Sequence, residues 1–339
     1  MDVPQDRAVG AIIGTLIGDA LGVGPHWYYD LDQMRKDYGE WIDQYTAPKP
    51  NRFHAGLQAG ENSQTGQVTT LLLESISEQG EYQESDFTRR LDALLNTLNG
   101  NPGSGRYTDH AMRDVWHARK KQGVEWTRAG SLADTAEAAI RTPVLAACYF
   151  KDFGNLMRYL ESNVLLTHRD PLIAGQSTAF GLIVAGLIDG YDLKEVSQVV
   201  IRRAGRSNAP LVIQPPDVGE DTRVSFTDAV LQPSWSYQAA HDPAIRIEPA
   251  WSACRLFGLA CTVGFMLPAA YYFTARFEND FYNAVMSALN GGGNNMARAA
   301  LTGALAGAQV GLKGIPQYLI EGLSDHERLI DMAKGITSE

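Results

Sequence analysis

The sequence predicts an all-α fold with many helices in a single domain. Apolar residues recur with the 3.6-residue period of a helix over most of the 339 residues. No stretch alternates apolar and polar residues for long enough to predict a β-sheet. Glycines spaced four apart near both ends predict closely packed helices, and no linker divides the chain. We therefore expect one domain spanning residues 1–339.

Two glycine stripes are the strongest local pattern. Residues four apart share one face of a helix, so each stripe gives a face that another helix or a ligand can approach closely. A glycine inside a helix costs up to about 1 kcal/mol relative to alanine, which implies a packing reason. We expect the stripes to pack against each other or against central neighbours. They comprise Gly10, Gly14, Gly18 and Gly22, and Gly303, Gly307 and Gly311 with Ala300, Ala304 and Ala308.

Further helices are expected between these ends. Ser131 with Asp134 resembles a capping box, and Glu84-Ser85-Asp86 also precedes a helical pattern. The expected helices cover residues 8–21, 66–79, 84–98, 107–122, 131–150, 153–166, 171–188, 193–203, 252–273, 277–289, 294–310 and 315–322.

Residues 205–249 differ from the rest of the chain. This segment is rich in proline, which excludes a continuous helix. A long run without regular structure is typical of a functional loop, an interface arm or a disordered segment. Because it contains Trp235 and Tyr237, we expect an ordered, irregular arm or lid. Such an arm could close a cleft or reach across a dimer, which leaves a homo-oligomer open.

The composition excludes several classes of function. A net charge of −10 and the lack of a basic stripe argue against a nucleic-acid partner. Three scattered cysteines without a CxxC pair predict neither a disulfide framework nor a zinc–thiolate site. The N-terminus does not resemble a signal peptide. The uncharged stretches 171–188 and 256–275 are long enough for a membrane span, but their polar, glycine and proline residues favour buried core helices. We therefore expect a cytoplasmic protein without a membrane partner.

The first candidate site is Asp19 at a glycine-lined helix end, followed by the cluster His26-Trp27-Tyr28. The rings could stack on a flat ligand, and Asp19 or His26 could act as acid or base. The alternative is structural, with Asp19 orienting a neighbouring loop and the aromatic residues in the core.

The second candidate site is the segment 60–67, just before an expected helix. Its oxygen and amide groups, together with free N–H groups at the helix N-terminus, could hold an anion or a ribose. An N-cap and turn is the alternative. The residues concerned are Glu61, Asn62, Ser63, Gln64, Thr65 and Gln67.

The third candidate site is Thr167-His168-Arg169-Asp170, again at a helix start. His168 could act as acid, base or hydrogen-bond donor, and Asp170 could contact a ligand. A histidine that caps the helix or holds a loop fits the pattern equally well.

The fourth candidate site is the loop 290–298. Its glycines bring backbone N–H groups close to a ligand, and its asparagines offer donors and acceptors. Arg298 could pair with a phosphate or with an internal carboxylate, whereas a purely structural turn is the alternative. The candidate binding residues are Gly292, Gly293, Asn294, Asn295 and Arg298.

In their order and spacing, these motifs resemble the ADP-ribosylglycohydrolase family over roughly residues 8–323. The matching segments are GAIIGTLIGDALG, THRDP and GGGNNMARAALTGALAGAQVGLKGIP. Residues 25–30 and 130–135 are most similar to the branch that contains the J-type lens crystallins of jellyfish and selenoprotein J. The resemblance implies an orthogonal helical bundle whose central cleft binds ADP-ribose, so an ADP-ribose-like small molecule is the expected partner.

The resemblance also implies a metal site, from which this chain departs. Hydrolytic members hold two magnesium ions through a Thr-Asp-Asp motif and a Gly-Gly-Asp-x-Asp-Thr motif, since magnesium prefers carboxylate oxygens. Here Ser63-Gln64-Thr65 replaces the first motif, and Asn294, Met296 and Ala297 replace the two aspartates and the threonine of the second. Neutral side chains cannot offset two dications, so we expect no stable magnesium pair and no other cofactor.

Three functions remain. The favoured one is a metal-independent hydrolase of a glycosidic or similar bond in a nucleotide- or sugar-like small molecule. In it, Glu61 or Asp19 acts as general acid or base with His26 or His168. The alternative is a non-catalytic, crystallin-like ligand-binding or structural descendant, and a magnesium-dependent hydrolase with replacement ligands ranks last. The hydrolase would be favoured over the non-catalytic descendant if one cleft brought together Glu61, Asp19, His26 and Asn294.

Overall fold

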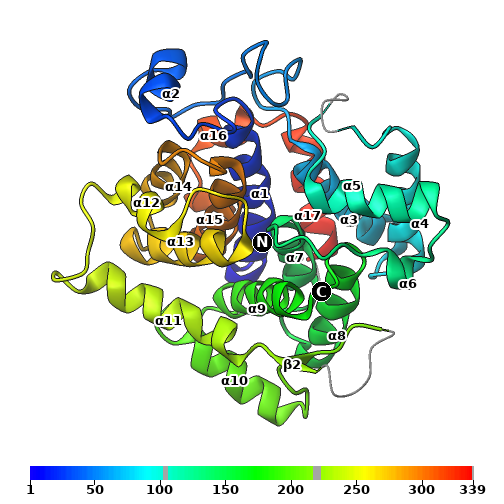
Figure 1. The fold of residues 1–339 in the computed structure, drawn as a ribbon. Helices are drawn as coiled ribbons and strands as arrows, with labels where there is room; N and C mark the ends of the chain where they lie inside the picture. Colours follow the sequence, from blue (N-terminus) through cyan, green and yellow to red (C-terminus); the bar gives the residue numbers. More distant parts are fainter. Residues whose placement is uncertain (102–105, 217–222, 338–339) are drawn as a thin grey trace.

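The computed structural model describes residues 1–101, 106–216 and 223–337, and it confirms the predicted all-helical, single-domain fold (Figure 1). Within these residues, β-structure is limited to isolated bridges and one two-stranded antiparallel ladder. The ladder pairs β1 (Val212–Ile213) with β2 (Val224–Ser225). The helices are α1 (Val3–Val23), α2 (Leu31–Tyr38), α3 (Gln64–Gln79), α4 (Glu84–Asn96), α5 (His110–Trp116), a π-helical segment (His117–Lys121), α6 (Trp126–Ala129), α7 (Glu137–Tyr149), α8 (Phe153–Leu165), α9 (Pro171–Ile188), α10 (Val196–Arg206), α11 (Thr227–His241), a 3-10 turn (Ala250–Ser252), α12 (Ala253–Phe257), α13 (Val263–Arg276), α14 (Phe281–Asn290), α15 (Asn295–Val310), a second 3-10 turn (Leu312–Gly314), α16 (Gln317–Glu321) and α17 (His326–Ile336).

Helices α1 and α15 form the central pair of the bundle. A Cβ atom added at Gly14 would lie 2.2 Å from the carbonyl oxygen of Gly303, and one added at Gly10 would lie 2.4 Å from that of Gly307. Gly18 meets the backbone of Ala299 in the same way. Backbones this close leave no room for a side chain at the crossing. Of the two arrangements expected for the stripes, packing against each other is the one found.

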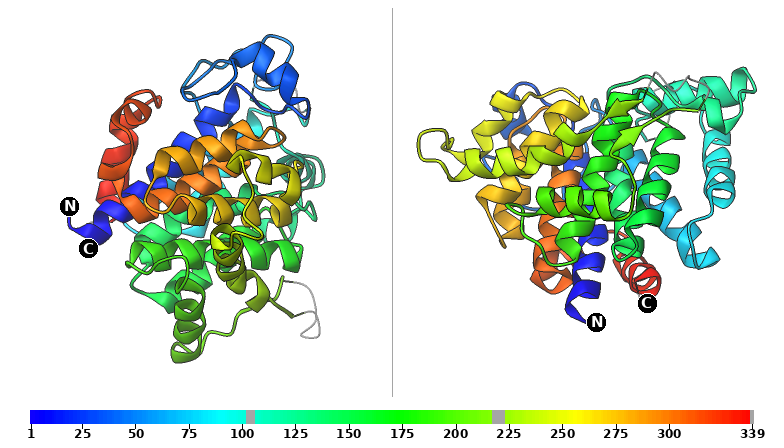
Figure 2. Two further views of the ribbon diagram at one scale, coloured as in Figure 1. Left: turned by 90° about the vertical axis from the view of Figure 1, so that its left-hand side faces the viewer. Right: turned by 90° about the horizontal axis from the view of Figure 1, so that it is seen from below.

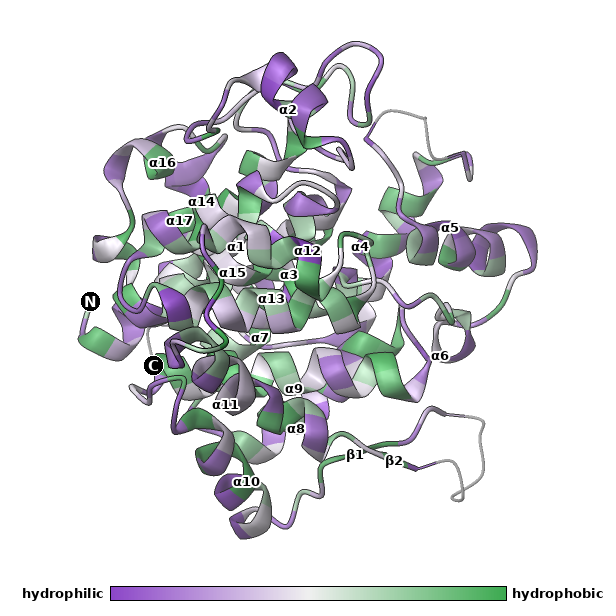
Figure 3. Cartoon of the chain, turned by 60° about the vertical axis from the view of Figure 1, so that its left-hand side comes forward, coloured by the Kyte–Doolittle hydropathy of each residue, from purple (hydrophilic) through white to green (hydrophobic). Residues whose placement is uncertain are grey.

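The other long helices surround this pair. Helices α7, α9 and α14 each contact both α1 and α15, and α13 contacts α14 and α15. Helices α8, α10 and α11 form a further layer on α9. In Figure 1, α9 runs across α1 rather than along it. Figure 3 shows that the outlying helix α2 is mostly hydrophilic, while apolar colouring is frequent on the central helices. The core therefore lies around the α1–α15 pair.

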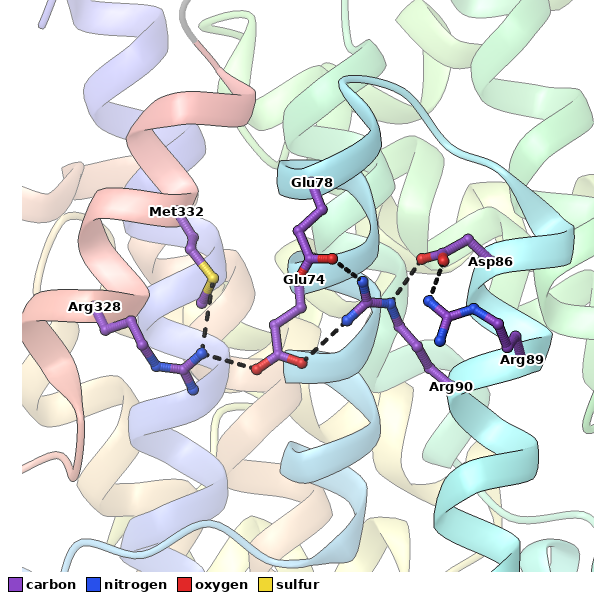
Figure 4. Close-up of polar contacts among 7 residues, drawn as sticks. All are labelled: Glu74, Glu78, Asp86, Arg89, Arg90, Arg328 and Met332. Atoms are coloured by element: carbon purple, nitrogen blue, oxygen red, sulfur yellow. Dashed lines mark hydrogen bonds and ion pairs between the residues drawn. The ribbon is translucent and has the colours of Figure 1, made fainter.

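The C-terminal helix α17 packs on α1 and α3 and is tied to α3 and α4 by ion pairs (Figure 4). Glu74 of α3 accepts a hydrogen bond from Arg328 of α17 at 2.8 Å and lies 3.6 Å from Arg90 of α4. Arg90 also pairs with Glu78 and, at 2.7 Å, with Asp86. These contacts hold α17 beside α3, and the start of α1 and the end of α17 lie close together in Figures 1 and 2.

The helix expected over residues 131–150 begins later, at Glu137. Ser131 does not cap it, because its backbone pairs with Thr167 and Arg169 at 2.8 Å. Its hydroxyl accepts a hydrogen bond from the N–H of Ala133 instead. The resemblance to a capping box was therefore misleading, since pairing with a distant loop competed with the local helix start.

The stretch 252–273 is not one helix. Helix α12 ends at Gly258, whose φ of 119° is a backbone conformation that glycine adopts readily and other residues do not. A new helix, α13, begins at Val263 and continues to Arg276. Three further helices, α2, α6 and α17, were not expected from the sequence. Helices α2 and α6 are short, and α17 follows a turn that contains glycine.

The prediction of an irregular arm over residues 205–249 is wrong in part. Residues 217–222 lie outside the described residues, but 227–241 form the regular helix α11, which packs on α9, α10 and α13. Pro233 lies inside this helix and is buried. A proline in a helix interior costs about 3 kcal/mol, so we infer that packing against the neighbouring helices offsets this cost. Residues 242–249 remain irregular.

One helix of the described chain, α9, is long and apolar enough to cross a bilayer by length and composition. In the structure, 83% of it is buried inside the bundle. This agrees with its interpretation as a core helix.

The glycine crossing gives a prediction about stability. Replacing Gly14→Ala should lower the free energy of unfolding by about 3 kcal/mol or more, because the new methyl group must push two backbones apart. Urea denaturation measures the change. Gly205→Ala is the matched control: it lies in helix α10 with no atom within 4 Å of an added Cβ. Gly205→Ala should raise the free energy of unfolding by about 0.5–1 kcal/mol. If Gly14→Ala and Gly205→Ala changed the free energy of unfolding equally, close packing at Gly14 would be contradicted.

Candidate functional site

A cavity of about 220 Å³ lies where four helices begin. Three of the helices place their N-cap residues in its wall, namely Ser63 of α3, Asp109 of α5 and Asn294 of α15. The fourth, α7, contributes its first residue, Glu137. Helix N-termini favour negative charge, so this junction suits a carboxylate. The other lining residues are His26, Trp27, His54, Thr65, Tyr107, His110, Arg113, Thr135, Cys261 and Met296.

Asp109 and Glu137 are the two carboxyl groups of this cavity. Burial raises the pKa of both, and the charge of Asp109 helps to raise the pKa of Glu137 to about 8. The Asp109 carboxylate accepts a hydrogen bond from the N–H of Met112 at 3.0 Å and is favoured by the charges of Arg113 and Arg141. In contrast, Glu137 Oε2 is buried without a hydrogen-bond partner. Near neutral pH we therefore assign the negative charge to Asp109 and the proton to Glu137.

A chain of hydrogen bonds supports Glu137 from the interior. Buried Arg141 donates to Thr167 Oγ1 at 2.8 Å, and that hydroxyl lies 2.9 Å from His168 Nδ1. The Thr167 hydroxyl accepts from Arg141 and can either donate to Nδ1 or accept from it, so the direction of this bond depends on the His168 tautomer. Nε2 lies 3.1 Å from Thr135 Oγ1 and 3.8 Å from Glu137 Oε2. Burial and the charge of Arg141 lower the pKa of His168 to about 3, so its ring is neutral.

His26 and His54 form a second pair in the cavity wall. His26 Nδ1 lies 2.8 Å from His54 Nε2, and both rings are buried. Burial lowers the pKa of His26 well below its usual value and that of His54 to about 4, and nearby Arg52 and Arg106 add to this effect. The side chain of Asn294 offsets only part of it for His26. Both rings are therefore neutral near pH 7.

Aromatic rings form one wall of the cavity. Trp27 stacks on His26 with ring centroids 5.1 Å apart, and Tyr107 meets both rings edge-on at 6.2 Å. Phe53 packs against Tyr107 at 4.9 Å. The wall presents flat, largely apolar surface beside the polar groups, which is typical of small-molecule sites.

The structure brings only some of the predicted site residues to this cavity. His26, Trp27, Ser63, Thr65 and Asn294 line it. The predicted convergence is therefore partial, because Asp19 and Glu61 do not line it.

Asp19 lies behind the cavity wall and is fully buried. Its carboxylate accepts hydrogen bonds from the Ser63 hydroxyl at 2.6 Å, the Ser63 N–H at 2.8 Å and the Asn62 amide at 3.0 Å. Burial raises the pKa of Asp19, and these bonds counteract the increase. Through these hydrogen bonds, Asp19 orients the loop that precedes α3.

Glu61 and Gln67 line a different hollow, between α3 and α17. The Glu61 carboxylate accepts a hydrogen bond from the Gln58 N–H at 2.6 Å and pairs with Arg106 at 3.3 Å. The prediction that Glu61 acts as acid or base therefore has no support from this geometry.

The remaining predicted residues have structural contacts. Arg298 pairs with neither a phosphate nor a carboxylate, since it is fully buried and donates to the carbonyl oxygens of Ala288 and Gly292. Asp170 caps α9, and Tyr28 donates to Asp37 at 2.6 Å. The other contacts are Gln64 to Thr108, Asn295 to Pro25 and Leu289, and Gly293 to the Tyr28 carbonyl.

The residues at the expected magnesium positions do not fit a magnesium pair. Ser63 donates its hydroxyl proton to Asp19 and caps α3 by accepting from the N–H of Thr65. Asn294 caps α15 with its amide oxygen, and Met296 presents a soft sulfur to the cavity. Magnesium requires several hard oxygen ligands in near-octahedral geometry. Among the described residues, no group of three or more His, Cys, Asp or Glu side chains gathers as a metal site.

Sequence reasoning missed Asp109, Glu137 and His54. Asp109 precedes a helix, which is an ordinary N-cap position and gave no signal of function. The expected helix 131–150 placed Glu137 in its interior, where a glutamate is a common surface residue. Only the later helix start reveals that Glu137 is the first residue of α7. His54 lies in a loop without a motif.

Comparison with known proteins gives one consistent family. The model of the ADP-ribosylglycohydrolase family matches residues 1–339. An uncharacterized protein of Archaeoglobus fulgidus is 26% identical over 336 residues, covering 97% of this chain and 95% of that protein. Crystallin J1A of Tripedalia cystophora is 23% identical over 358 residues, covering 99% and 98%. A solved structure described as an ADP-ribosylglycohydrolase-related protein complex has the same fold, with a TM-score of 0.67, 18% identity and coverage of 100% and 99%.

The buried proton on Glu137 gives a prediction about stability and pH. The folded protein holds this proton up to about pH 8, whereas an unfolded glutamate loses it near its ordinary pKa. Stability should therefore fall as the pH rises from about 4.5 to 8. Glu137→Gln removes this dependence, so its melting temperature relative to wild type should rise by at least about 2 °C between pH 5 and pH 9. The control is Glu81→Gln, which changes an exposed glutamate. If the difference in melting temperature between Glu137→Gln and wild type did not change with pH, the assignment of a buried proton to Glu137 would be contradicted.

Proposed function

We propose that this chain, which belongs to the ADP-ribosylglycohydrolase family, is a metal-independent hydrolase that cleaves a glycosidic bond in a nucleotide- or sugar-like small molecule. The Asp109–Glu137 pair carries this proposal. Glycoside hydrolysis uses two carboxyl groups with different protonation, one as acid and one as base or nucleophile. Burial and mutual charge give these two groups such a difference.

The chemistry assigned to the pair is a direct hydrolysis. Glu137 gives its proton to the heteroatom of the leaving group as the bond from this atom to the anomeric carbon breaks. The negative charge of Asp109 stabilises the oxocarbenium-like transition state. Asp109 also takes one proton from the attacking water, whose oxygen forms the new bond to the anomeric carbon. Proton exchange with solvent then restores Glu137 as the acid and Asp109 as the base.

His168 has a positioning role in this proposal rather than a direct one. Its Nε2 lies 3.1 Å from Thr135 Oγ1 and 3.8 Å from Glu137 Oε2, and in the tautomer with the proton on Nε2 it favours the Glu137 carboxylate that forms after proton transfer. His26, Trp27, Ser63, Thr65 and Asn294 line the cavity and are the groups available to contact the substrate. Asp19 holds Ser63 in place from behind.

A second function has its own support. One relative is a crystallin, and crystallin J1A aligns with nearly the whole chain. Neutral residues stand where the family's magnesium ligands are expected. A non-catalytic, crystallin-like structural or ligand-binding role is therefore the alternative. It requires no proton transfer from Glu137, and this separates it from the hydrolase by experiment.

The catalytic assignment predicts the effect of removing each carboxyl group. Asp109→Asn and Glu137→Gln should each lower kcat/KM at least about 100-fold, since general acid–base catalysis contributes about 10² to 10⁴. Release of base or sugar from a panel of nucleosides and aryl glycosides can be followed by chromatography. Wild-type activity should fall as the pH rises through about 8, where Glu137 loses its proton. Glu161→Gln is the matched control, because Glu161 is also partly buried with a raised pKa but lies outside the cavity.

Metal independence gives a separate prediction. Activity after treatment with EDTA and activity with added magnesium should differ by less than about twofold, because the residues at the expected magnesium positions are not carboxylates. The same purified protein is assayed under both conditions. Activity that depends on magnesium would contradict the proposal. Ligand binding without turnover of any substrate in the panel would favour the non-catalytic alternative.

A further inference from the structure

A smaller inner chamber of about 10 Å³ lies behind the two carboxyl groups. A space of this size has room for about one water molecule and for no larger ligand. The inner chamber shares Thr65, Asp109 and Glu137 with the cavity described above. The rest of its wall is buried and belongs to the inner chamber alone, comprising Val68, Ala111, Met112, Arg141, Thr167 and His168.

One carboxyl oxygen of Glu137 lies on the side of this inner chamber. Glu137 Oε2 is 3.8 Å from His168 Nε2, and His168 lines the inner chamber but not the larger cavity. This oxygen is buried, and no group among the described residues forms a hydrogen bond with it. Buried polar atoms in native proteins are nearly always bonded to protein, water or a ligand. We therefore expect the occupant of the inner chamber to donate a hydrogen bond to Oε2.

The charges around the inner chamber favour a neutral occupant. Asp109 is negative, and Arg141 remains positive near pH 7 although burial lowers its pKa to about 10. Glu137 holds its proton, and the ring of His168 is neutral. Cys261 from the loop before α13 is also neutral, because burial and nearby carboxyl groups raise its pKa to about 11. An added cation would face the guanidinium of Arg141, and an added anion would face Asp109.

We propose that the inner chamber binds one water molecule that bridges the two carboxyl groups, donating one hydrogen bond to Glu137 Oε2 and the other to Asp109. A guanidinium N–H of Arg141 supplies the hydrogen bond that this water accepts. Three hydrogen bonds are typical of a buried water. The water site rests on the inner chamber and its lining groups, whereas its role in catalysis rests on the proposed hydrolase.

The bridging water acts on the proposed reaction through Glu137. When Glu137 gives its proton to the leaving group, negative charge develops on the carboxyl oxygens. A donor that already points at Oε2 stabilises this charge without reorganisation during the reaction. The water does not contact the substrate, so its role is to stabilise the ionised form of the acid.

A crystal structure of the wild-type full chain tests the site directly. At pH 6 Glu137 holds its proton. Electron density is expected for one ordered water within hydrogen-bond distance of both Glu137 Oε2 and the Asp109 carboxylate. An inner chamber without ordered water, or with an ion in it, would overturn the proposal.

Two variants that fill the inner chamber test the effect of the water on Glu137. Ala111→Val adds two methyl groups from α5, and Val68→Ile adds one from α3. The pKa of Glu137, followed by carbon NMR of labelled carboxyl groups, should rise by at least about 1, because its carboxylate loses a donor. The control is Ala147→Val, a buried alanine of α7 that lines neither space. It overpacks the core in the same way and should leave the pKa unchanged.

Kinetics separate a role in stabilising the acid from a role in binding. Because Ala111 and Val68 line the inner chamber and not the larger cavity, KM should stay within about twofold of wild type in both variants. The kcat should fall about tenfold or more, since a hydrogen bond to a charged group is lost in the transition state. In Ala147→Val, neither constant should change by more than about twofold.

Each outcome decides one proposal. An ordered water together with an unchanged pKa of Glu137 in both filling variants would overturn the bridging role, because filling a space without a bridging water leaves the carboxylate its donors. An ordered water and the raised pKa, without cleavage of any glycoside by wild type, would refute the hydrolase and leave the water site standing. Cleavage by a wild-type protein whose inner chamber holds no water would do the reverse.

Discussion

The contact on which the rest of the structure depends is the backbone-to-backbone crossing of α1 and α15. It joins segments almost 300 residues apart, and it is possible only because glycines remove the side chains at the crossing. At its end, Gly22 meets the backbone of Met296. The segment after α1 and the loop before α15 are therefore adjacent. As a result, His26 and Asn294 face the same cavity.

The position of the cavity follows from this arrangement and from the directions of the surrounding helices. Four helices begin there, and their N-termini favour a negative group. The family resemblance implied magnesium-binding carboxylates at two of these starts. In this chain those two starts carry Ser63 and Asn294, and the acids stand at the other two, as Asp109 and Glu137. The same helical framework thus places a carboxyl pair beside the positions where the resemblance predicted the metal ligands.

The state of each titratable group follows from burial together with its neighbours. His26, His54 and His168 are neutral because burial disfavours charge and arginines lie nearby. Asp109 keeps its charge because a helix N-terminus and two arginines favour it. Glu137 also begins a helix, but burial and the negative charge of Asp109 outweigh this and raise its pKa to about 8, so it keeps its proton. The cavity therefore combines one negative charge, one acidic proton and an uncharged pair of histidines.

The sequence by itself determined the helical class, the pairing of the glycine stripes and the family resemblance, because each is encoded by local periodicity or by short motifs. It also identified Trp27, Ser63, Thr65 and Asn294 within such motifs. Only the tertiary structure decided which acids share a cavity. Asp109 and Glu137 both fell inside helices expected from the sequence, where acidic residues are common and give no signal of a site. Their burial in one cavity and the effect of the Asp109 charge on the pKa of Glu137 arise from the tertiary packing of the helices that carry them, which no local pattern records.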